Sequence, residues 1–268
     1  MPGSSSTMPT LFIPHGGGPC FFMEWNPPDT WKKMGEFLAN LRTTLPATPA
    51  AVAVISGHWE TAEFSVATNP HPPLIYDYSG FPPHTYQLTY SAPGDPAVAG
   101  KIRELLDAGG FSARPDPARG FDHGVFIPFK MIFPEADVPI VQLSLRQGLD
   151  PGTHLAAGHA LAALRDQGVL IVGSGMSYHN LRGFGEAYSQ ESDEFDAWLT
   201  AAATAPNPAK REELLKNWAQ APHARLAHPR EEHLLPLMVA AGAAGDDAGR
   251  RVFSDRVMGV TVSAYQFG

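Results

Sequence analysis

The feature that most constrains the fold of this chain is an alternation of short, continuous apolar runs with longer helical segments. The clearest predicted strands are Ala51–Ile55, Val138–Leu145 and Val169–Val172. Helices are predicted to open at Asp95-Pro96 and Asp150-Pro151, where proline occupies the first helical position. Strands that are apolar along their length are buried on both faces, as in sheets covered by helices. The pattern therefore predicts an α/β domain with helices on both faces of a central sheet.

The domain organisation follows from length and composition. The chain has 268 residues, of which 44% are hydrophobic, and this is enough to build one large domain. We see no internal repeat and no clear linker. The small polar residues of the N-terminus predict a flexible tail over residues 1–9, followed by a single domain over residues 10–268.

Charge and hydropathy exclude several classes of function. The net charge is −8, and lysines and arginines do not cluster, so nucleic-acid binding has little electrostatic support. No apolar run approaches the roughly 20 residues of a membrane span. The single cysteine, Cys20, excludes an intrachain disulfide, and the N-terminus lacks the pattern of a secretory signal. We expect a cytoplasmic protein, and the sequence gives no indication of its oligomeric state.

Histidines follow several of the predicted strands. His15, His58 and His179 each come a few residues after an apolar run, near glycines. Functional sites of open α/β sheets lie beyond the carboxyl ends of strands, so these side chains can converge. Imidazole suits iron, zinc, copper and nickel. Two interpretations remain open: a metal or catalytic site, or separate histidines that are simply hydrogen-bonded.

Two further histidines stand in structured settings. His123 lies in a tight loop, where the preceding Asp122 is a candidate to orient it. His233 lies at the start of a helix predicted from about Glu231, where helix packing or capping explains it nearly as well as metal binding.

Seven short motifs occur in order between residue 11 and the C-terminus. They are Pro-His-Gly-Gly-Gly-Pro at 14–19, Ile-Ser-Gly-His-Trp-Glu at 55–60, Tyr-Asp-Tyr-Ser-Gly-Phe-Pro at 76–82, Phe-Asp-His-Gly at 121–124, Gly-Ser-Gly-Met-Ser-Tyr-His-Asn at 173–180, Glu-His-Leu-Leu-Pro-Leu at 232–237 and Ser-Ala-Tyr-Gln-Phe-Gly at 263–268. Together they resemble the class III extradiol ring-cleavage dioxygenases, in their DOPA 4,5-dioxygenase-like branch. The resemblance implies that residues 10–268 form one catalytic α/β domain with a mixed central sheet.

The resemblance also implies a ligand set for one divalent metal. His15, His58 and His233 match the three ligand positions of this branch. Another branch of the superfamily uses two histidines and a glutamate, so Glu231 or Glu232 is an adjacent alternative for the third ligand.

The implied chemistry is the cleavage of a catechol ring with dioxygen. His179 matches the acid/base histidine, close enough to the metal to be a further ligand, and His123 matches a second active-site histidine near the substrate. Fe(II) is the expected ion because dioxygen needs a redox-active metal to react with a closed-shell ring, whereas zinc has no redox chemistry. Zinc remains an alternative occupant of the purified protein, and the sequence does not name the catechol.

Three hypotheses compete at this point: an extradiol dioxygenase, a zinc-dependent hydrolase, and a non-catalytic metal-binding relative. The absence of a carboxylate placed clearly beside the histidines counts against the hydrolase. The presence of both His123 and His179 beyond the three implied ligands favours an enzyme. The aromatic loop at residues 76–90 is interpreted either as a substrate lid or as loop packing.

Overall fold

The computed structural model describes residues 7–268, so most of the predicted tail lies outside the described residues. The last residues of that segment are packed. Met8 and Pro9 are buried. The Met8 N–H donates to the carbonyl oxygen of Arg165 at 3.2 Å, and Arg165 Nε donates to the Met8 carbonyl at 2.7 Å. These two residues therefore belong to the folded body.

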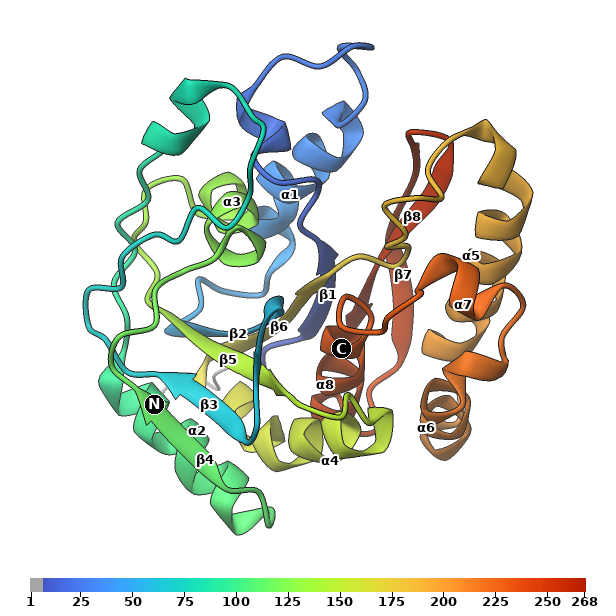
Figure 1. Cartoon of the computed structure of the whole chain (residues 1–268). Coiled ribbons are helices and arrows are strands. Elements are labelled where there is room, and N and C mark those ends of the chain that lie inside the picture. The colour runs from blue at the N-terminus through green and yellow to red at the C-terminus, as the bar shows by residue number, and fades with distance from the viewer. Residues whose placement is uncertain (1–6) are drawn as a thin grey trace.

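The described residues form one mixed sheet of eight strands in the order β4-β3-β5-β2-β6-β1-β8-β7 (Figure 1). The strands are β1 (Thr10–Pro14), β2 (Ala51–Thr61), β3 (Phe64–Ala67), β4 (Ala113–Asp116), β5 (Ile140–Arg146), β6 (Val169–Gly175), β7 (Gly249–Val257) and β8 (Val260–Phe267). The four central strands β5, β2, β6 and β1 are parallel. Strands β8 and β3 pair antiparallel with β1 and β5, so the predicted mixed α/β sheet is confirmed.

Helices cover both faces of this sheet, as predicted. The longer ones are α1 (Lys32–Thr44), α2 (Pro96–Ala108), α3 (His123–Ile132), α4 (Pro151–Leu161), α5 (Ser189–Ala203), α6 (Pro208–Lys216) and α8 (Leu235–Ala243). The short helical segments are α7 (Ala224–Ala227) and the 3₁₀ turns η1 (Cys20–Phe22), η2 (Pro83–Gln87), η3 (Ala162–Gln167), η4 (Glu186–Tyr188) and η5 (Trp218–Gln220). Gly173 in β6 faces Pro236 of α8, whereas the hydroxyl of the next residue, Ser174, donates to the carbonyl of Gly124 in α3. Because successive strand residues face opposite sides, α8 and α3 lie on opposite faces.

The strand predicted to end at Ile55 is longer than expected. β2 continues through Ser56, Gly57 and His58 to Thr61. Its pairing with β6 ends at Ser56, and its register with β5 is irregular between Ile55 and Glu60. His58 therefore lies within an irregular stretch of strand and not in a loop beyond it. The glycine that favoured an end marks this irregularity instead.

Other elements also differ from the prediction. The helix α3 is an addition to the predicted elements; it is buried on nearly all sides and contains Pro128, a residue that argues against a helix interior. The last helix begins at Leu235 and not at Glu231, since residues 231–234 form a turn before it. None of the helices within residues 7–268 combines the length and apolar character needed to cross a bilayer.

Candidate metal centre and active site

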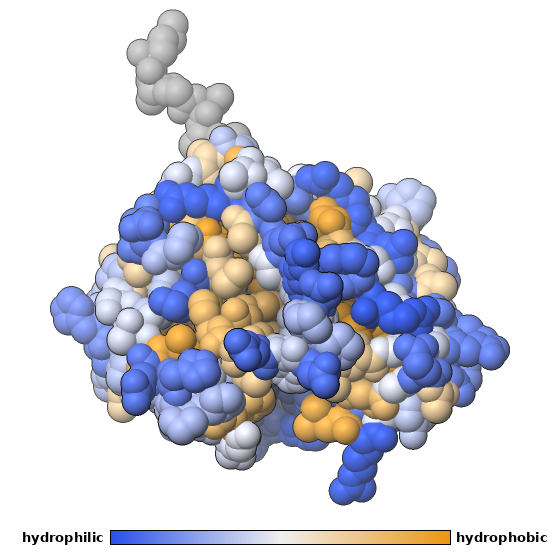
Figure 2. Space-filling view, turned by 90° about the horizontal axis from the view of Figure 1, so that it is seen from above, coloured by the Kyte–Doolittle hydropathy of each residue, from blue (hydrophilic) through white to orange (hydrophobic). Residues whose placement is uncertain are grey.

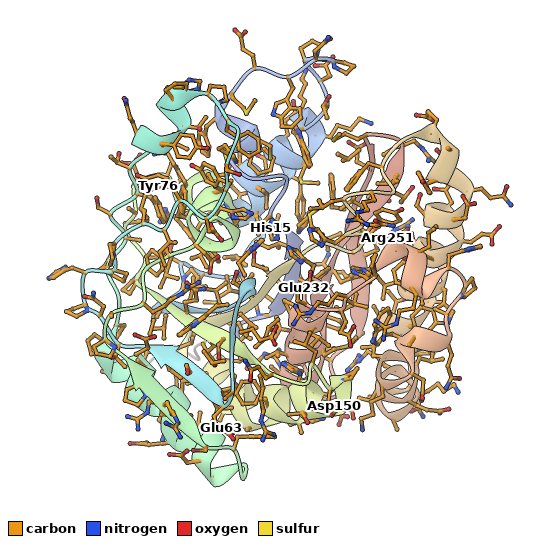
Figure 3. All side chains as sticks on the ribbon, in the orientation of Figure 1. His15, Glu63, Tyr76, Asp150, Glu232 and Arg251 are labelled. Atoms are coloured by element: carbon orange, nitrogen blue, oxygen red, sulfur yellow. The ribbon has the colours of Figure 1, made fainter. Side chains whose placement is uncertain are left out.

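Three histidines meet beyond the carboxyl ends of the parallel strands. His15 directly follows β1, His58 lies in β2, and His233 stands in the turn before α8. The Nε2 atom of His58 is 3.3 Å from Nε2 of His15 and 3.2 Å from Nε2 of His233. Figure 3 shows His15 and Glu232, the neighbour of His233, near the middle of the molecule, far from Asp150. The three segments are thus brought together only by the sheet.

The protonation of these rings is set by the partners of their Nδ1 atoms. His15 Nδ1 lies 2.9 Å from the carbonyl oxygen of Gly16, and His233 Nδ1 lies 3.0 Å from Oε1 of Glu232. Both oxygens accept, so each Nδ1 carries the hydrogen and each Nε2 presents a lone pair. His58 Nε2 carries at most one hydrogen, so it can donate to Nε2 of His15 or to Nε2 of His233, but not to both. A bound cation satisfies all three nitrogens.

The spacing of the donor atoms fits such a cation. Metal–imidazole distances of about 2.1 Å place adjacent ligand nitrogens roughly 3.0–3.4 Å apart in octahedral or tetrahedral geometry. The 3.2 and 3.3 Å separations at His58 agree with that range. The set contains imidazoles and no thiolate, a donor set that suits iron or zinc.

The electrostatics keep the three rings neutral. Burial, reinforced by the neighbouring histidines, lowers the pKa of His15 and His233 well below the ordinary value. Burial and the nearby His123 lower the pKa of His58 to about 4. Neutral imidazoles are required for metal binding, because a proton and a metal compete for the same lone pair.

Two glycines allow the segment before α8 to cross the strand ends. A Cβ atom at Gly175, the last residue of β6, would lie 2.1 Å from the carbonyl oxygen of His233. A Cβ atom at Gly57 would lie 3.1 Å from the carbonyl oxygen of Glu232. The Met176 N–H donates to the His233 carbonyl at 3.0 Å. Close backbone approach therefore determines where the third histidine stands.

His123 opens α3 beside this cluster. Its ring centroid is 3.9 Å from that of His58 and 5.3 Å from that of His15. Its Nδ1 and its backbone N–H both contact Oδ1 of Asp77, at 2.8 and 2.9 Å. Burial alone would raise the pKa of Asp77, but the hydrogen bonds and charge interaction with His123, together with His58, outweigh it, so the pKa lies below its usual value. Asp77 is therefore an ionised partner that orients His123.

The expectation that Asp122 orients His123 is wrong. The buried Asp122 carboxylate instead accepts hydrogen bonds from Ser56 Oγ, Arg119 and Gln142. Sequence reasoning assigned no role to Asp77, although it stands in the motif at residues 76–82. Only the fold brings it to a residue 46 positions later.

His179 lies on the other side of the cluster. Its ring stacks on His233 with centroids 3.4 Å apart, and its Nδ1 is 3.5 Å from Oε1 of Glu232. Glu232 thus faces the Nδ1 atoms of both rings. Burial alone would raise the pKa of Glu232, but the contact with His179, a backbone hydrogen bond and the nearby Arg230 together outweigh it and hold this pKa below its usual value. Glu231 points elsewhere, since it pairs with Arg225 at 2.6 Å.

Among the described residues, two other groups of possible metal ligands lie beside the group of His15, His58 and His233. Within residues 7–268, ligand atoms lie within 4.8 Å of one another in three groups: His15, His58 and His233; His58, Asp77 and His123; and His179, Glu232 and His233. Asp77 and Glu232 are each already engaged by a histidine Nδ1. The all-histidine group is the one whose three Nε2 atoms face each other.

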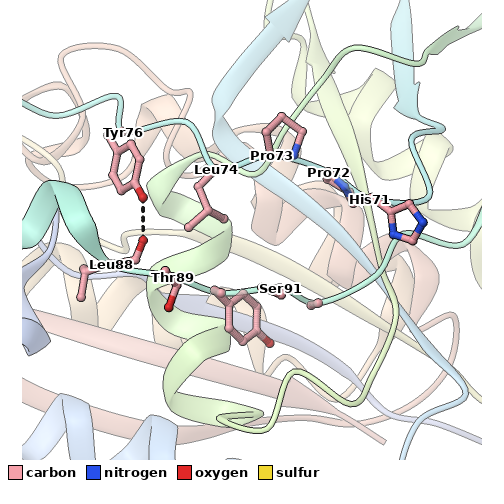
Figure 4. A pocket seen from close by; sticks show the side chains of 10 residues that line it. His71, Pro72, Pro73, Leu74, Tyr76, Leu88, Thr89 and Ser91 are labelled. Carbon is pink, nitrogen blue, oxygen red and sulfur yellow. Dashed lines mark hydrogen bonds between the residues drawn. The ribbon is translucent and has the colours of Figure 1, made fainter.

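A cavity of about 350 Å³ opens over the histidines. Tyr78 and Phe81 of the aromatic loop line it, together with the apolar side chains of Trp31, Met176, Leu181 and Phe184. The loop also packs on itself. Tyr76 Oη donates to the Leu88 carbonyl at 2.6 Å across a separate surface groove that none of the five clustered histidines lines (Figure 4). Some aromatic side chains of this loop therefore line the cavity, whereas Tyr76 packs within the loop itself.

The chain is similar to several known proteins over most of its length. The family described as the catalytic LigB subunit of aromatic ring-opening dioxygenase matches residues 9–267. A 4,5-DOPA dioxygenase extradiol of Beta vulgaris is 41% identical, over 89% of this chain and 88% of that protein. The dioxygenase tasH of Hapsidospora irregularis is 37% identical, over 97% of this chain and 85% of that protein. The crystal structure of an uncharacterized protein from Escherichia coli K12 superposes with a TM-score of 0.78 at 30% identity, covering 97% of this chain and 100% of that one.

Proposed function

Since the chain belongs to the LigB family of aromatic ring-opening dioxygenases, we propose that it holds iron(II) on the Nε2 atoms of His15, His58 and His233. The chain is an extradiol dioxygenase, an enzyme that opens a catecholic ring with dioxygen at a single metal. The observation that carries the ligand assignment is the 3.2 and 3.3 Å approach of the three Nε2 atoms. A three-ligand site leaves room for catechol and dioxygen together.

Iron is preferred to zinc because of the chemistry that the family performs. Bound iron(II) supplies the electron transfer that allows dioxygen to react with a closed-shell ring, which zinc cannot do. The zinc-hydrolase and non-catalytic hypotheses lose their support, because the family and the named relatives are ring-cleaving dioxygenases.

We assign the first proton transfer to His123. Asp77 holds the hydrogen on its Nδ1, so the neutral ring presents an Nε2 lone pair on its opposite side. His123 lines the same cavity as His15 and His58. Its Nε2 can accept the hydroxyl proton that a catechol loses on binding, and the anionic Asp77 then stabilises the resulting imidazolium.

We assign proton return during ring opening to His179. It lines the cavity, stacks on His233 and lies near the carboxylate of Glu232, which stabilises its charged form. The two histidines flank the ligands on opposite sides, one beside His58 and the other beside His233. A proton can therefore leave the substrate on one side and return on the other.

Metal replacement tests the proposal. Metal-free protein is loaded anaerobically with either Fe(II) or Zn(II), and oxygen uptake is measured with catechols, including DOPA, which the names of several relatives specify. We expect dioxygen and catechol to be consumed in equal amounts by the iron form alone. Oxygen uptake by the zinc form at a comparable rate would contradict the assignment of iron(II). A lack of oxygen uptake by the iron form would contradict it as well.

A further inference from the structure

The cavity over the histidines adjoins a second cavity. The outer one measures about 650 Å³ and shares Phe184 with the inner one. The walls of the two also touch, because Trp25 of the outer cavity packs against Trp31 of the inner cavity with ring centroids 5.6 Å apart. A substituent on a ring held at the histidines can therefore contact Phe184, the residue that lines both cavities.

The surface along this path is apolar. Leu181 at the inner cavity is 78% exposed and Met258 at the outer cavity is 47% exposed, and they are the large hydrophobic side chains most open to solvent within residues 7–268. Figure 2 views the molecule from the side of η2 and the β7–β8 hairpin and shows apolar surface between hydrophilic side chains. Exposed apolar side chains at the lips of adjoining cavities indicate contact with an apolar group.

The charges along this path disfavour an anion. In the described lining of the inner cavity, Asp77 is the only charged group apart from the histidines, and neither lysine nor arginine is present. The outer cavity adds Asp29 and Glu186. Its one cation, Arg256, already makes two hydrogen bonds to the carboxylate of Asp193, at 2.9 and 2.7 Å.

We propose that the catechol cleaved by this enzyme carries an apolar substituent without a carboxylate, which lies along Leu181 and Phe184 toward Met258. The inference rests on the proposed function, because the histidine cluster positions the ring. An acidic substituent on this path would be withdrawn from water beside Asp77 and Glu186 without a free cation, which costs binding energy. An alkyl group gains binding energy there through burial.

A substrate series tests the inference on the iron-loaded enzyme. The values of kcat/KM are measured by oxygen uptake for 4-methylcatechol, 4-butylcatechol and 3-(3,4-dihydroxyphenyl)propanoate. We expect kcat/KM to rise about fourfold for each methylene that becomes buried. The propanoate, similar in length to the butyl compound, should fall at least about tenfold below it because its carboxylate is desolvated without a partner. Equal values, or a preference for the propanoate, would overturn the inference.

Binding separates this inference from the proposed function. The dissociation constants of the same three catechols are measured by calorimetry on the zinc-loaded protein. If turnover is absent but binding keeps the order butyl, methyl, propanoate, the ligand class stands and the proposed function fails. If the propanoate binds most tightly, the ligand class is wrong whatever the enzyme does.

A charge variant tests the path itself. Leu181→Arg places a cation at the lip of the cavity, and Ala201→Arg adds the same charge at an exposed position of α5 that lines neither cavity. We expect Leu181→Arg to raise the propanoate-to-butyl ratio of kcat/KM about tenfold, as for a new charge-assisted contact. Ala201→Arg should leave the ratio unchanged. An equal shift in both variants would show that net charge, and not this path, selects the substrate.

Discussion

The backbone N–H and the Nδ1 of His123 both donate to one oxygen, Oδ1, of Asp77, at 2.9 and 2.8 Å. This pair of hydrogen bonds fixes the ring orientation and the tautomer of His123. The same carboxylate places its other oxygen 3.8 Å from Nδ1 of His58. Asp77 thereby links a proposed proton acceptor to a proposed metal ligand.

Asp77→Asn should reduce turnover while the metal remains bound. The amide preserves the shape of the side chain but removes the charge that stabilises protonated His123, so we expect kcat to fall roughly 10- to 100-fold. Oxygen uptake and metal content are measured on the same preparation. Asp137→Asn, which breaks a surface pair with Arg42, is the matched control and should be neutral for catalysis. Unchanged kcat in Asp77→Asn would exclude an orienting role.

His58→Ala should abolish metal binding and activity together. His58 supplies the Nε2 atom that approaches both His15 and His233, at 3.3 and 3.2 Å, so its loss leaves only two of the three proposed ligand nitrogens. Metal analysis of the folded variant decides the question. His159→Ala, which removes a histidine paired with Glu212 outside the site, should keep full occupancy. Full occupancy in His58→Ala would disprove the ligand assignment.

His179→Phe should keep most of the metal and lose most of the turnover. Phenylalanine preserves the stack on His233, at 3.4 Å in the native pair, but cannot move a proton. The loss of an acid/base group typically costs about 10²–10⁴-fold in rate. Anaerobic iron titration and steady-state oxygen uptake are compared. If iron binding collapses in step with activity, His179 is a ligand, and if both persist, His123 alone moves the proton.

Gly175→Ala should lower metal affinity, because the added methyl group displaces the His233 carbonyl that it would meet at 2.1 Å. Gly100→Ala in α2 is the matched control, since nothing lies within 4 Å of its added methyl group. The control should stabilise the protein by about 0.5–1 kcal/mol through helix propensity. Metal titration and urea unfolding are measured for both variants. Normal metal affinity in Gly175→Ala would show that the segment before α8 can move without cost.

The metal-free protein should lose stability as the pH falls from about 6.5 toward 4, partly through His228. Burial lowers the pKa of His228 to about 4, so the unfolded chain binds more protons than the folded one in this interval. Between pH 7 and pH 5 this histidine should cost roughly 2 kcal/mol of unfolding free energy. In His228→Phe, which keeps the packing against Phe195 and Trp218, the pH dependence should shrink by that amount. Urea unfolding at both pH values measures it, and an unchanged pH dependence would rule out His228 as a contributor.

Local signals were sufficient for several elements of the fold. The apolar run Val169–Val172 predicted β6, which continues to Gly175, and the Asp95-Pro96 start predicted the first residue of α2. These signals act within a few residues, through capping, proline geometry and burial of a continuous apolar run. Elements without a regular alternation of apolar and polar residues, or without a continuous apolar run, were not predicted. α3 lacks a polar face, and β7 is an edge strand with little continuous burial.

The sequence by itself determined the chemistry that is available: five histidines in short motifs, a single cysteine, and a chain of alternating strands and helices. It could not determine which atoms face each other, because contacts between residues as distant as His58 and His233 depend on the register and the crossovers of the sheet. The tertiary structure decided that three Nε2 atoms converge and that Asp77, not Asp122, orients His123. The physical reason is that a side chain's nearest partners are set by backbone paths, whereas sequence motifs report only its immediate neighbours.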